Sequence, residues 1–400
     1  MKKNHQTALI HAPRKAPQYV STVQPPLFRA STIFFDSTDA LFNRHWTDRY
    51  DYSYGTHGTP TTFTLADNIA QIEGGEFCLL APSGLSAINL VNSCFLTQGD
   101  EVWVADNIYG PNMEHLRNLQ QRYGIQVKVY NPIDAATFQP TDQAKLIWLE
   151  AAGSVTLEFP DLIQLVKKAQ AHNILTALDN TWGAGLAFNA FDFGEAHLSV
   201  DISVHALTKY PSGGGDILMG SVVTRDEKLH HQLFRMHALQ GISISGDDAA
   251  QIQRSLASMQ IRYEHQSQSA MTLLHWLKQQ PEFAQVLHPA DASSAGHAHW
   301  KEICTTGQSA GLVSVIFKPE YTLQDIRHFC DALSLFKLGF SWGGPVSLVM
   351  LYNLKDMRAL KHTHLQQGLL VRFCIGLEHP QDLIQDIENA LKQLKTRHIE

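Results

Sequence analysis

The sequence has few cysteines, no long apolar run and no block of one charge. Its 400 residues include five cysteines without CxxC spacing, so we expect reduced, buried thiols rather than a disulfide framework. It contains no apolar run of about 18 residues, the minimum for a membrane-spanning helix. Its first residues lack the apolar core of a signal peptide. The sequence therefore predicts a soluble protein of the cytoplasm.

The charge balance also excludes several classes of partner. Lys and Arg number 31 against 38 Asp and Glu, and the two signs are interspersed, which argues against nucleic acid or an anionic membrane as partner. Two close histidine pairs, His297 with His299 and His362 with His364, have no nearby carboxylate or cysteine in the sequence. A zinc-type site needs such additional ligands. We expect a small-molecule ligand and no metal.

The chain divides into three parts. Residues 1–58 show little periodicity and predict an extended arm that packs on another surface. Residues 59–250 alternate predicted helices and strands, which indicates a mostly parallel sheet covered on both faces. Residues 251–400 begin with a long helical stretch and continue with mixed strands, which predicts a smaller α+β domain. The predicted strands are 77–81, 101–105, 126–130, 146–149, 174–178, 200–204, 219–223, 312–317 and 370–375, and the predicted helices are 64–72, 86–96, 113–123, 160–171 and 380–394.

A turn at Ser83 and Gly84 joins a predicted strand to a predicted helix. Free backbone N–H groups at a helix start, beside a glycine that allows close approach, can bind a phosphate. The turn matches neither the Walker nor the GxGxxG pattern, and most such turns bind nothing. Alone, it does not assign a ligand.

Two charged residues follow strands of the same predicted domain: Asp179, and Lys209 with Thr208 before it and three glycines after it. The ends of strands are where α/β sheets place their chemistry. A lysine there could bind an aldehyde cofactor covalently, and an acid could keep a pyridine nitrogen protonated. A buried ion pair is the alternative interpretation. Together with the phosphate turn and the ring of Tyr109, which follows another strand, the set points to pyridoxal phosphate.

At this point the sequence resembles, over essentially its whole length, the Cys/Met-metabolism enzymes of pyridoxal phosphate fold type I. The motifs that carry the resemblance are YGTHGTPT at 54–61, PSG at 82–84, DNTW at 179–182, TKY at 208–210, FSWGG at 340–344 and VRFCIGLE at 371–378. The resemblance implies an aspartate-aminotransferase-like α/β fold with a mostly parallel seven-stranded sheet. Residues 153–158 and the Ser-Trp-Gly-Gly run look most like the bacterial cystathionine β-lyase branch. The γ-acting branches usually have glutamate at the position of Phe340 and leucine at that of Trp342.

The resemblance also implies a role for each candidate residue. Lys209 would attach the cofactor and remove the substrate α-proton, Asp179 would contact the ring nitrogen, and Tyr109 would stack on the ring. Arg372 would bind the substrate α-carboxylate in a bidentate fork. The other implied cofactor contacts are Gly84, Leu85, Thr181, Thr208 and, from the neighbouring subunit, Tyr54, and the other implied substrate contacts are Ser341, Trp342, His57 and Glu114.

Two positions depart from the family pattern. Arginine is usual where Thr56 stands and reaches the cofactor phosphate across the dimer, so weaker cofactor retention is expected here. The β-lyase branch often has a second arginine at His57, where it can meet the distal end of cystathionine. Because histidine is shorter and mostly neutral, a smaller cysteine S-conjugate or cystine remains open as substrate. Glu114 would then face a distal ammonium group.

These observations predict a carbon–sulfur β-lyase of trans-sulfuration and methionine biosynthesis. It would convert L-cystathionine or a related cysteine S-conjugate to a thiol such as homocysteine, pyruvate and ammonia. The alternatives are a γ-lyase, homoserine-ester sulfhydrylase or γ-synthase of the same family and, from another class, a catalytically silent binding protein of this fold. The expected assembly is a homotetramer, a dimer of dimers with shared active sites.

Overall fold

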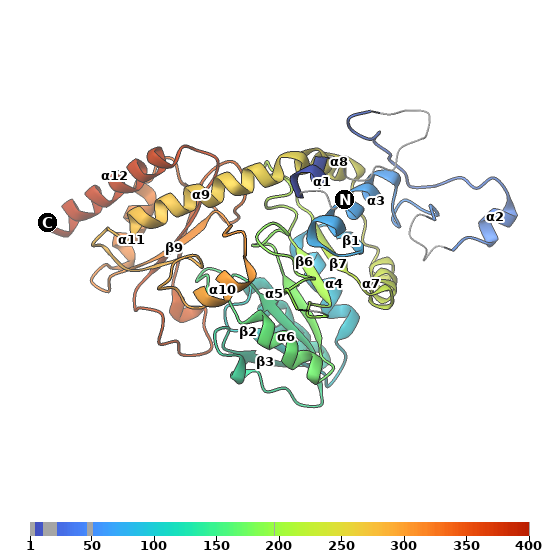
Figure 1. Cartoon of the computed structure of the whole chain (residues 1–400), viewed down its shortest axis with the longest axis horizontal. Coiled ribbons are helices and arrows are strands. Elements are labelled where there is room, and N and C mark those ends of the chain that lie inside the picture. The colour runs from blue at the N-terminus through green and yellow to red at the C-terminus, as the bar shows by residue number, and fades with distance from the viewer. Residues whose placement is uncertain (1–4, 11–21, 46–50, 196, 400) are drawn as a thin grey trace.

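The structure is a computed structural model that describes residues 5–10, 22–45, 51–195 and 197–399 (Figure 1). It contains a seven-stranded sheet built from residues 77–224 and a five-stranded sheet built from residues 283–374. The predicted fold class, α/β with a second smaller sheet domain, is confirmed. Within the predicted arm of residues 1–58, residues 1–4, 11–21 and 46–50 lie outside the described residues.

The larger sheet has the strand order β1-β7-β6-β5-β4-β2-β3. Only β7 runs against the other six, because it pairs antiparallel with both β6 and β1. The carboxyl ends of six strands therefore meet at one edge, where α/β sheets bind their ligands. The strands are β1 (Phe77–Ala81), β2 (Glu101–Ala105), β3 (Gln126–Tyr130), β4 (Ala144–Glu150), β5 (Leu175–Asp179), β6 (Ile202–His205) and β7 (Gly220–Thr224).

Helices cover both faces of this sheet, as the near-continuous apolar strands require. The apolar stripes of α4, α5 and α7 pack on one face, and those of α3 and α6 pack on the other. The helices of this part are α3 (Pro60–Glu73), α4 (Gly84–Phe95), α5 (Gly110–Tyr123), α6 (Leu162–Ala171), α7 (Glu227–Leu239) and α8 (Gly246–Ser255).

The smaller sheet has the order β10-β11-β12-β9-β8 and is antiparallel except for the pair β10 and β11. A core of its own, formed with α9, α11 and α12, covers one side of it. The strands are β8 (Phe283–Leu287), β9 (Leu312–Phe317), β10 (Lys337–Leu338), β11 (Leu348–Tyr352) and β12 (Leu370–Cys374), and the helices are α9 (Met259–Leu277), α10 (His297–Ile303), α11 (Leu323–Ala332) and α12 (Pro380–Ile399).

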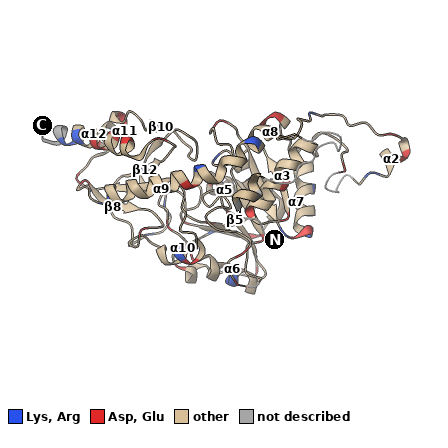
Figure 2. Ribbon diagram, turned by 45° about the horizontal axis from the view of Figure 1, so that its top comes forward, with Lys and Arg blue, Asp and Glu red and all other residues tan. Residues whose placement is uncertain are grey.

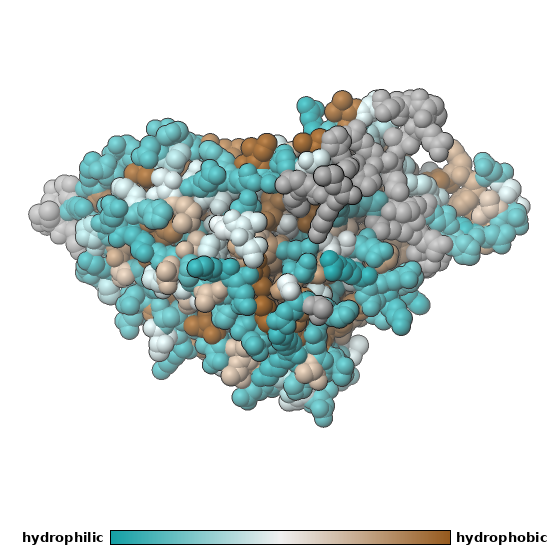
Figure 3. Space-filling view, in the orientation of Figure 1, coloured by the Kyte–Doolittle hydropathy of each residue, from teal (hydrophilic) through white to brown (hydrophobic). Residues whose placement is uncertain are grey.

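The amino-terminal segment crosses α3 and then projects away from the body of the molecule with α2 (Thr38–Phe42), whereas the short α1 (His5–Ile10) lies near α8 (Figure 1). Thr32 and Tyr54 form an isolated antiparallel bridge where the segment returns. Acidic and basic residues are scattered along the ribbon (Figure 2), and the face seen in Figure 3 mixes hydrophilic and apolar residues. Among the described residues, no helix is long and apolar enough to cross a membrane.

Candidate active site

Two carboxylates end neighbouring strands of the larger sheet. Glu150 closes β4 and Asp179 closes β5, and the two residues are register partners. The Glu150 Oε2 atom accepts a hydrogen bond from the backbone N–H of Tyr109, which follows β2, at 2.6 Å. Burial, together with the nearby charge of Asp179, raises the pKa of Glu150 well above its usual range. Glu150 therefore fixes the backbone of Tyr109 beside the strand end that carries Asp179.

Asp179 is held from one side only. Thr181 donates to its Oδ1 atom twice, from the backbone N–H at 3.0 Å and from the hydroxyl at 2.5 Å. The Thr181 oxygen in turn accepts the N–H of Ala206 at 3.0 Å, which ties Asp179 to the end of β6. Burial raises the pKa of Asp179, against the opposing effect of these hydrogen bonds. Among the described residues, hydrogen bonds reach Oδ1 alone, which leaves Oδ2 for a cationic partner.

Lys209 lies four residues beyond β6, next to the loop between β10 and β11. Its Nζ atom donates to the Ser341 hydroxyl at 2.9 Å and lies 5.5 Å from the ring centroid of Trp342. Burial and the positive charge of Arg372 lower the pKa of Lys209 to about 8. At pH 7.4 roughly a fifth of the amine is then neutral, which is the form that a nucleophile or a base requires.

The amino terminus of α4 points at the same edge. The Ser83 hydroxyl caps the helix by accepting the N–H of Ser86 at 3.0 Å, so the preceding N–H groups of Gly84 and Leu85 are not used by this cap. A Cβ atom on Gly84 would lie 2.6 Å from the Cβ of Ala206, so only glycine allows this close approach to the Lys209 loop. The Thr208 hydroxyl in that loop bonds the backbone of Met219.

Arg372 enters from the smaller sheet. It lies in the middle of β12, where Ser314 of β9 and Met350 of β11 are its register partners. The Tyr352 ring centroid is 5.4 Å from the guanidinium carbon, and among the described residues no hydrogen-bond partner reaches the buried Nε atom. A buried N–H group without a partner is costly, so the Nε atom of Arg372 is suited to bind an anion.

The remaining predicted residues lie elsewhere on this chain. The Tyr54 hydroxyl is 3.3 Å from that of Ser31, and the ring is half exposed. His57 Nδ1 lies 2.9 Å from the Ser53 hydroxyl, and the residue lines a small cavity together with Thr56 and Leu80. Glu114 is exposed on the first turns of α5. Their predicted roles, two of them in a neighbouring subunit, stay predictions.

The arrangement fits pyridoxal phosphate. The start of α4 offers unpaired N–H groups to a phosphate, Asp179 offers Oδ2 to a pyridinium nitrogen, and Lys209 offers an amine of lowered pKa for covalent attachment. The tight contact of Gly84 with Ala206 brings the start of α4 close to the loop that contains Lys209. The buried Nε atom of Arg372, which has no partner among the described residues, adds a site for a carboxylate.

Two members of the site were not predicted. Glu150 follows the predicted strand 146–149 by one residue, which is the same signal that identified Asp179. Tyr352 ends β11, a strand whose sequence carries no clear alternation, and it contacts a residue 20 positions away. The sequence contained a usable signal for Glu150 and none for Tyr352.

Comparison with known proteins gives consistent matches over nearly the whole chain. A family model described as Cys/Met metabolism PLP-dependent enzyme matches residues 6–392. A cystathionine β-lyase from Bordetella avium is 36% identical over 97% of this chain and 98% of its own length. An L-alanine/L-glutamate racemase from Wolbachia pipientis is 31% identical, with 97% of each chain covered. A crystal structure of cystathionine γ-synthase from Xanthomonas oryzae, in complex with aminoacrylate and cysteine, superposes with a TM-score of 0.86 at 26% identity, covering 99% of this chain and 100% of the other.

Proposed function

Because the chain belongs to the Cys/Met metabolism family of PLP-dependent enzymes, we propose that it is a carbon–sulfur β-lyase. It cleaves the Cβ–S bond of L-cystathionine or a related cysteine S-conjugate and releases a thiol, pyruvate and ammonia. The proposal rests on two groups that lie near each other: Lys209, whose pKa is lowered, and Arg372, which offers a site for a carboxylate. Its relatives include named cystathionine β-lyases of similar length, which supports this choice of reaction.

The residues around Lys209 divide the work of holding the cofactor. Lys209 would hold it covalently, Asp179 Oδ2 would pair with the ring nitrogen, and Tyr109 would contact the ring. The start of α4 and the Thr208 hydroxyl would hold the phosphate. Bound in this way, pyridoxal phosphate supplies an electron sink for the substrate Cα.

Proton removal falls to Lys209. Arg372 binds the α-carboxylate through two parallel N–H groups, which limits how the amino acid can turn. Once the substrate amino group has replaced Lys209 on the cofactor, the freed neutral amine of Lys209 would take the proton from Cα. The Ser341 hydroxyl, 2.9 Å from Nζ, keeps that amine in place. With Cα deprotonated, the thiolate leaves from Cβ, and hydrolysis of the remaining three-carbon fragment gives pyruvate and ammonia.

Several exposed apolar residues on the amino-terminal segment favour a shared-site homotetramer. Phe34 and Phe42 are 92% and 80% exposed on a segment that leaves the body of the molecule (Figure 1), and surfaces of this kind mark protein contacts. In the assembly Tyr54 and His57 reach the site of the neighbouring subunit. The reduced state expected of the five free cysteines suits an enzyme that works in the cytoplasm.

A keto-acid assay tests the reaction. With L-cystathionine, β-elimination yields pyruvate and γ-elimination yields 2-oxobutyrate, so pyruvate is the expected product and 2-oxobutyrate alone would contradict the proposal. A panel with cystine and S-alkyl cysteines ranks the substrates. L-Alanine is included because one relative is named a racemase: conversion to D-alanine without release of pyruvate from any thioether would assign that activity instead.

Co-expression tests the shared site. Lys209→Ala and Tyr54→Ala subunits are each expected to be inactive alone. A mixed dimer places both substitutions in one site and neither in the other, so an equal mixture recovers about a quarter of wild-type activity. No recovery, in an assembly shown by light scattering to contain both subunits, would contradict sharing.

A further inference from the structure

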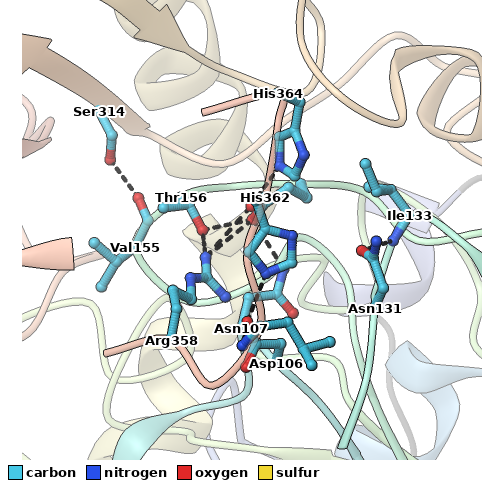
Figure 4. Close-up of polar contacts among 12 residues, drawn as sticks. Asp106, Asn107, Asn131, Ile133, Val155, Thr156, Ser314, Arg358, His362 and His364 are labelled. Carbon is cyan, nitrogen blue, oxygen red and sulfur yellow. Dashed lines mark hydrogen bonds and ion pairs between the residues drawn. The ribbon is translucent and has the colours of Figure 1, made fainter. Parts of the chain in front are cut away.

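The segment between β11 and β12 leaves the smaller sheet and contacts the larger one (Figure 4). Residues 358–364 lie against two loops of the larger sheet, the one that follows β2 and the one that follows β4. We call the residues that make these contacts the latch: they are Asp106, Asn107, Thr156, Glu158, Arg358, His362 and His364.

Asp106 anchors one end of the latch. Its carboxylate accepts the backbone N–H groups of Ala359 at 2.8 Å and Leu360 at 3.3 Å, and it lies 2.5 Å from the Nε2 atom of His362. The side chains of Asp106 and His362 are only 1% and 3% exposed. Buried charge-assisted hydrogen bonds of this kind are the stronger ones in proteins.

Glu158 anchors the other end. It accepts hydrogen bonds from Asn107 Nδ2 at 2.9 Å and Thr156 Oγ1 at 2.5 Å, and His364 Nε2 lies 3.0 Å away. Arg358 Nη2 lies 3.4 Å from each of its oxygens, and the two side chains are 2% and 8% exposed. Although burial opposes ionisation, the Arg358 charge and these hydrogen bonds hold the pKa of Glu158 well below its usual range. The pair is therefore a buried ion pair.

Both ends of the latch adjoin the active site. Asp106 precedes Tyr109 by three residues, and the latched segment runs from Tyr352 to the strand that carries Arg372. Ser314, the register partner of Arg372, donates to the carbonyl of Val155 at 2.6 Å, beside Thr156 (Figure 4). The latch contacts thus connect β12, which carries Arg372, to the loop after β2, which carries Tyr109.

We propose that Asp106, Glu158 and Arg358 are positioning residues that set the affinity of the site for amino-acid substrates. They hold the Arg372 guanidinium at a fixed distance from Tyr109 and Lys209, so the α-carboxylate and the α-proton reach their partners together. This inference rests on the proposed function, because it assigns Arg372 to the substrate carboxylate.

The test uses the holoenzyme and two matched substitutions. Glu158→Gln removes the buried carboxylate, and Glu195→Gln removes a carboxylate of the exposed Lys167–Glu195 pair, whose atoms are 2.8 Å apart. L-Alanine, which has no leaving group at Cβ, is titrated into each protein, and its Kd is read from the cofactor absorbance. We expect Glu158→Gln to raise this Kd about tenfold, with unchanged cofactor content, and Glu195→Gln to leave it unchanged.

Turnover separates positioning from general damage. In Glu158→Gln the KM for the best thioether should rise about tenfold while kcat changes less than about threefold. Arg358→Lys keeps a charge near Glu158 and should recover part of the affinity that Arg358→Gln loses. A loss of kcat together with cofactor, at unchanged KM, would overturn the proposal in favour of a merely structural role.

Hydrogen exchange gives a readout without substrate. In Asp106→Asn the amides of Ala359 and Leu360 should exchange faster, and those of residues 106–110 should follow. Unchanged hydrogen exchange in both segments, or an unchanged Kd for L-alanine, would contradict the proposed positioning role of the latch residues. Absence of pyruvate from wild type contradicts the β-lyase reaction instead, so the two failures are distinguishable.

Discussion

The two sides of the site are built in different ways. We call Asp179, Glu150 and Lys209 the cofactor side, and Arg372 with its neighbours the carboxylate side. Asp179 and Glu150 end parallel strands and Lys209 lies in a loop beyond a third, so one continuous sheet edge positions all three. Arg372 instead lies mid-strand in an antiparallel sheet, with neighbours on both sides. The first arrangement is local to one sheet, whereas the second depends on how two sheets are held together.

The two sides are nevertheless coupled by charge. Arg372 contributes, after burial, to the lowered pKa of Lys209. Under the proposed assignment, Arg372, which would bind the substrate, therefore adjusts the reactivity of Lys209, which would hold the cofactor. Substitutions on each side should separate the two contributions, and the following expectations run from the largest effect to the smallest.

Lys209→Ala should abolish cofactor attachment and proton removal and leave the carboxylate side intact. Pyruvate release should fall by at least about 10³-fold, because both the covalent attachment and the base are lost. The visible absorbance of the bound cofactor should disappear on gel filtration. A variant that keeps this absorbance, or releases pyruvate at a comparable rate, would place the chemistry on another residue.

Arg372→Leu should act mainly on the carboxylate side. We expect kcat/KM for the best thioether to fall about 100-fold, because the α-carboxylate loses a buried bidentate partner. The cofactor absorbance should remain, and Arg372→Lys should recover only part, because an ammonium group cannot form the planar fork. Equal kinetics in all three proteins would remove Arg372 from the site.

The pH dependence of cofactor uptake should show the effect of the Arg372 charge on the pKa of Lys209. The neutral amine of Lys209 is the reactive form, so the uptake rate of the cofactor-free protein should rise as the pH increases toward 8 and then level off. From pH 6 to pH 8 the neutral fraction increases about 50-fold.

In Arg372→Leu the positive neighbour is gone, so the Lys209 pKa should be higher and the plateau should move to higher pH. Stopped-flow absorbance measures both profiles. Identical profiles in the two proteins would show that the coupling is absent.

Tyr352→Leu should keep Arg372 but remove the ring that helps to position its guanidinium group. The ring lies 5.4 Å from the guanidinium carbon, and the loss of such a contact should raise KM about fivefold at nearly constant kcat. Tyr352→Phe keeps the ring and serves as the control. If both variants raise KM equally, the hydroxyl rather than the ring is responsible.

Thr56→Arg should give the smallest effect. If the neighbouring subunit carries this position to the cofactor phosphate, the added charge should tighten cofactor binding about threefold. Equilibrium dialysis of the cofactor-free proteins measures this, with His57→Arg as a comparison of equal charge. An affinity unchanged by Thr56→Arg would contradict a phosphate contact at this position.

The cofactor side was largely predictable from the sequence. Three of the predicted strands of the larger sheet, β1, β2 and β3, have the observed limits, because short apolar runs bounded by turn residues define them. The residues that follow such strands lie at a common edge, which is why Asp179 and Lys209 could be selected. The same reasoning applies to Glu150, which follows the predicted strand 146–149 by one residue but was not selected.

The carboxylate side was predictable only through family resemblance. Arg372 carries no local signal, because a mid-strand arginine is equally compatible with an exposed sheet face. The strand β11 and the helix α7 were not predicted, so the position of Tyr352 was not either. The latch joins Glu158 to Arg358 across 200 residues, a contact that no local pattern can specify.

That separation in sequence also has a consequence for synthesis. Arg358 leaves the ribosome 200 residues after Glu158, which at about 5–20 residues per second is an interval of about 10–40 seconds. During this time β5, which ends at Asp179, and the loop after β6 that contains Lys209 are synthesised, whereas the Glu158 carboxylate still lacks its cation. The nascent chain can thus form the cofactor site before the Glu158–Arg358 pair closes and before β12 adds Arg372.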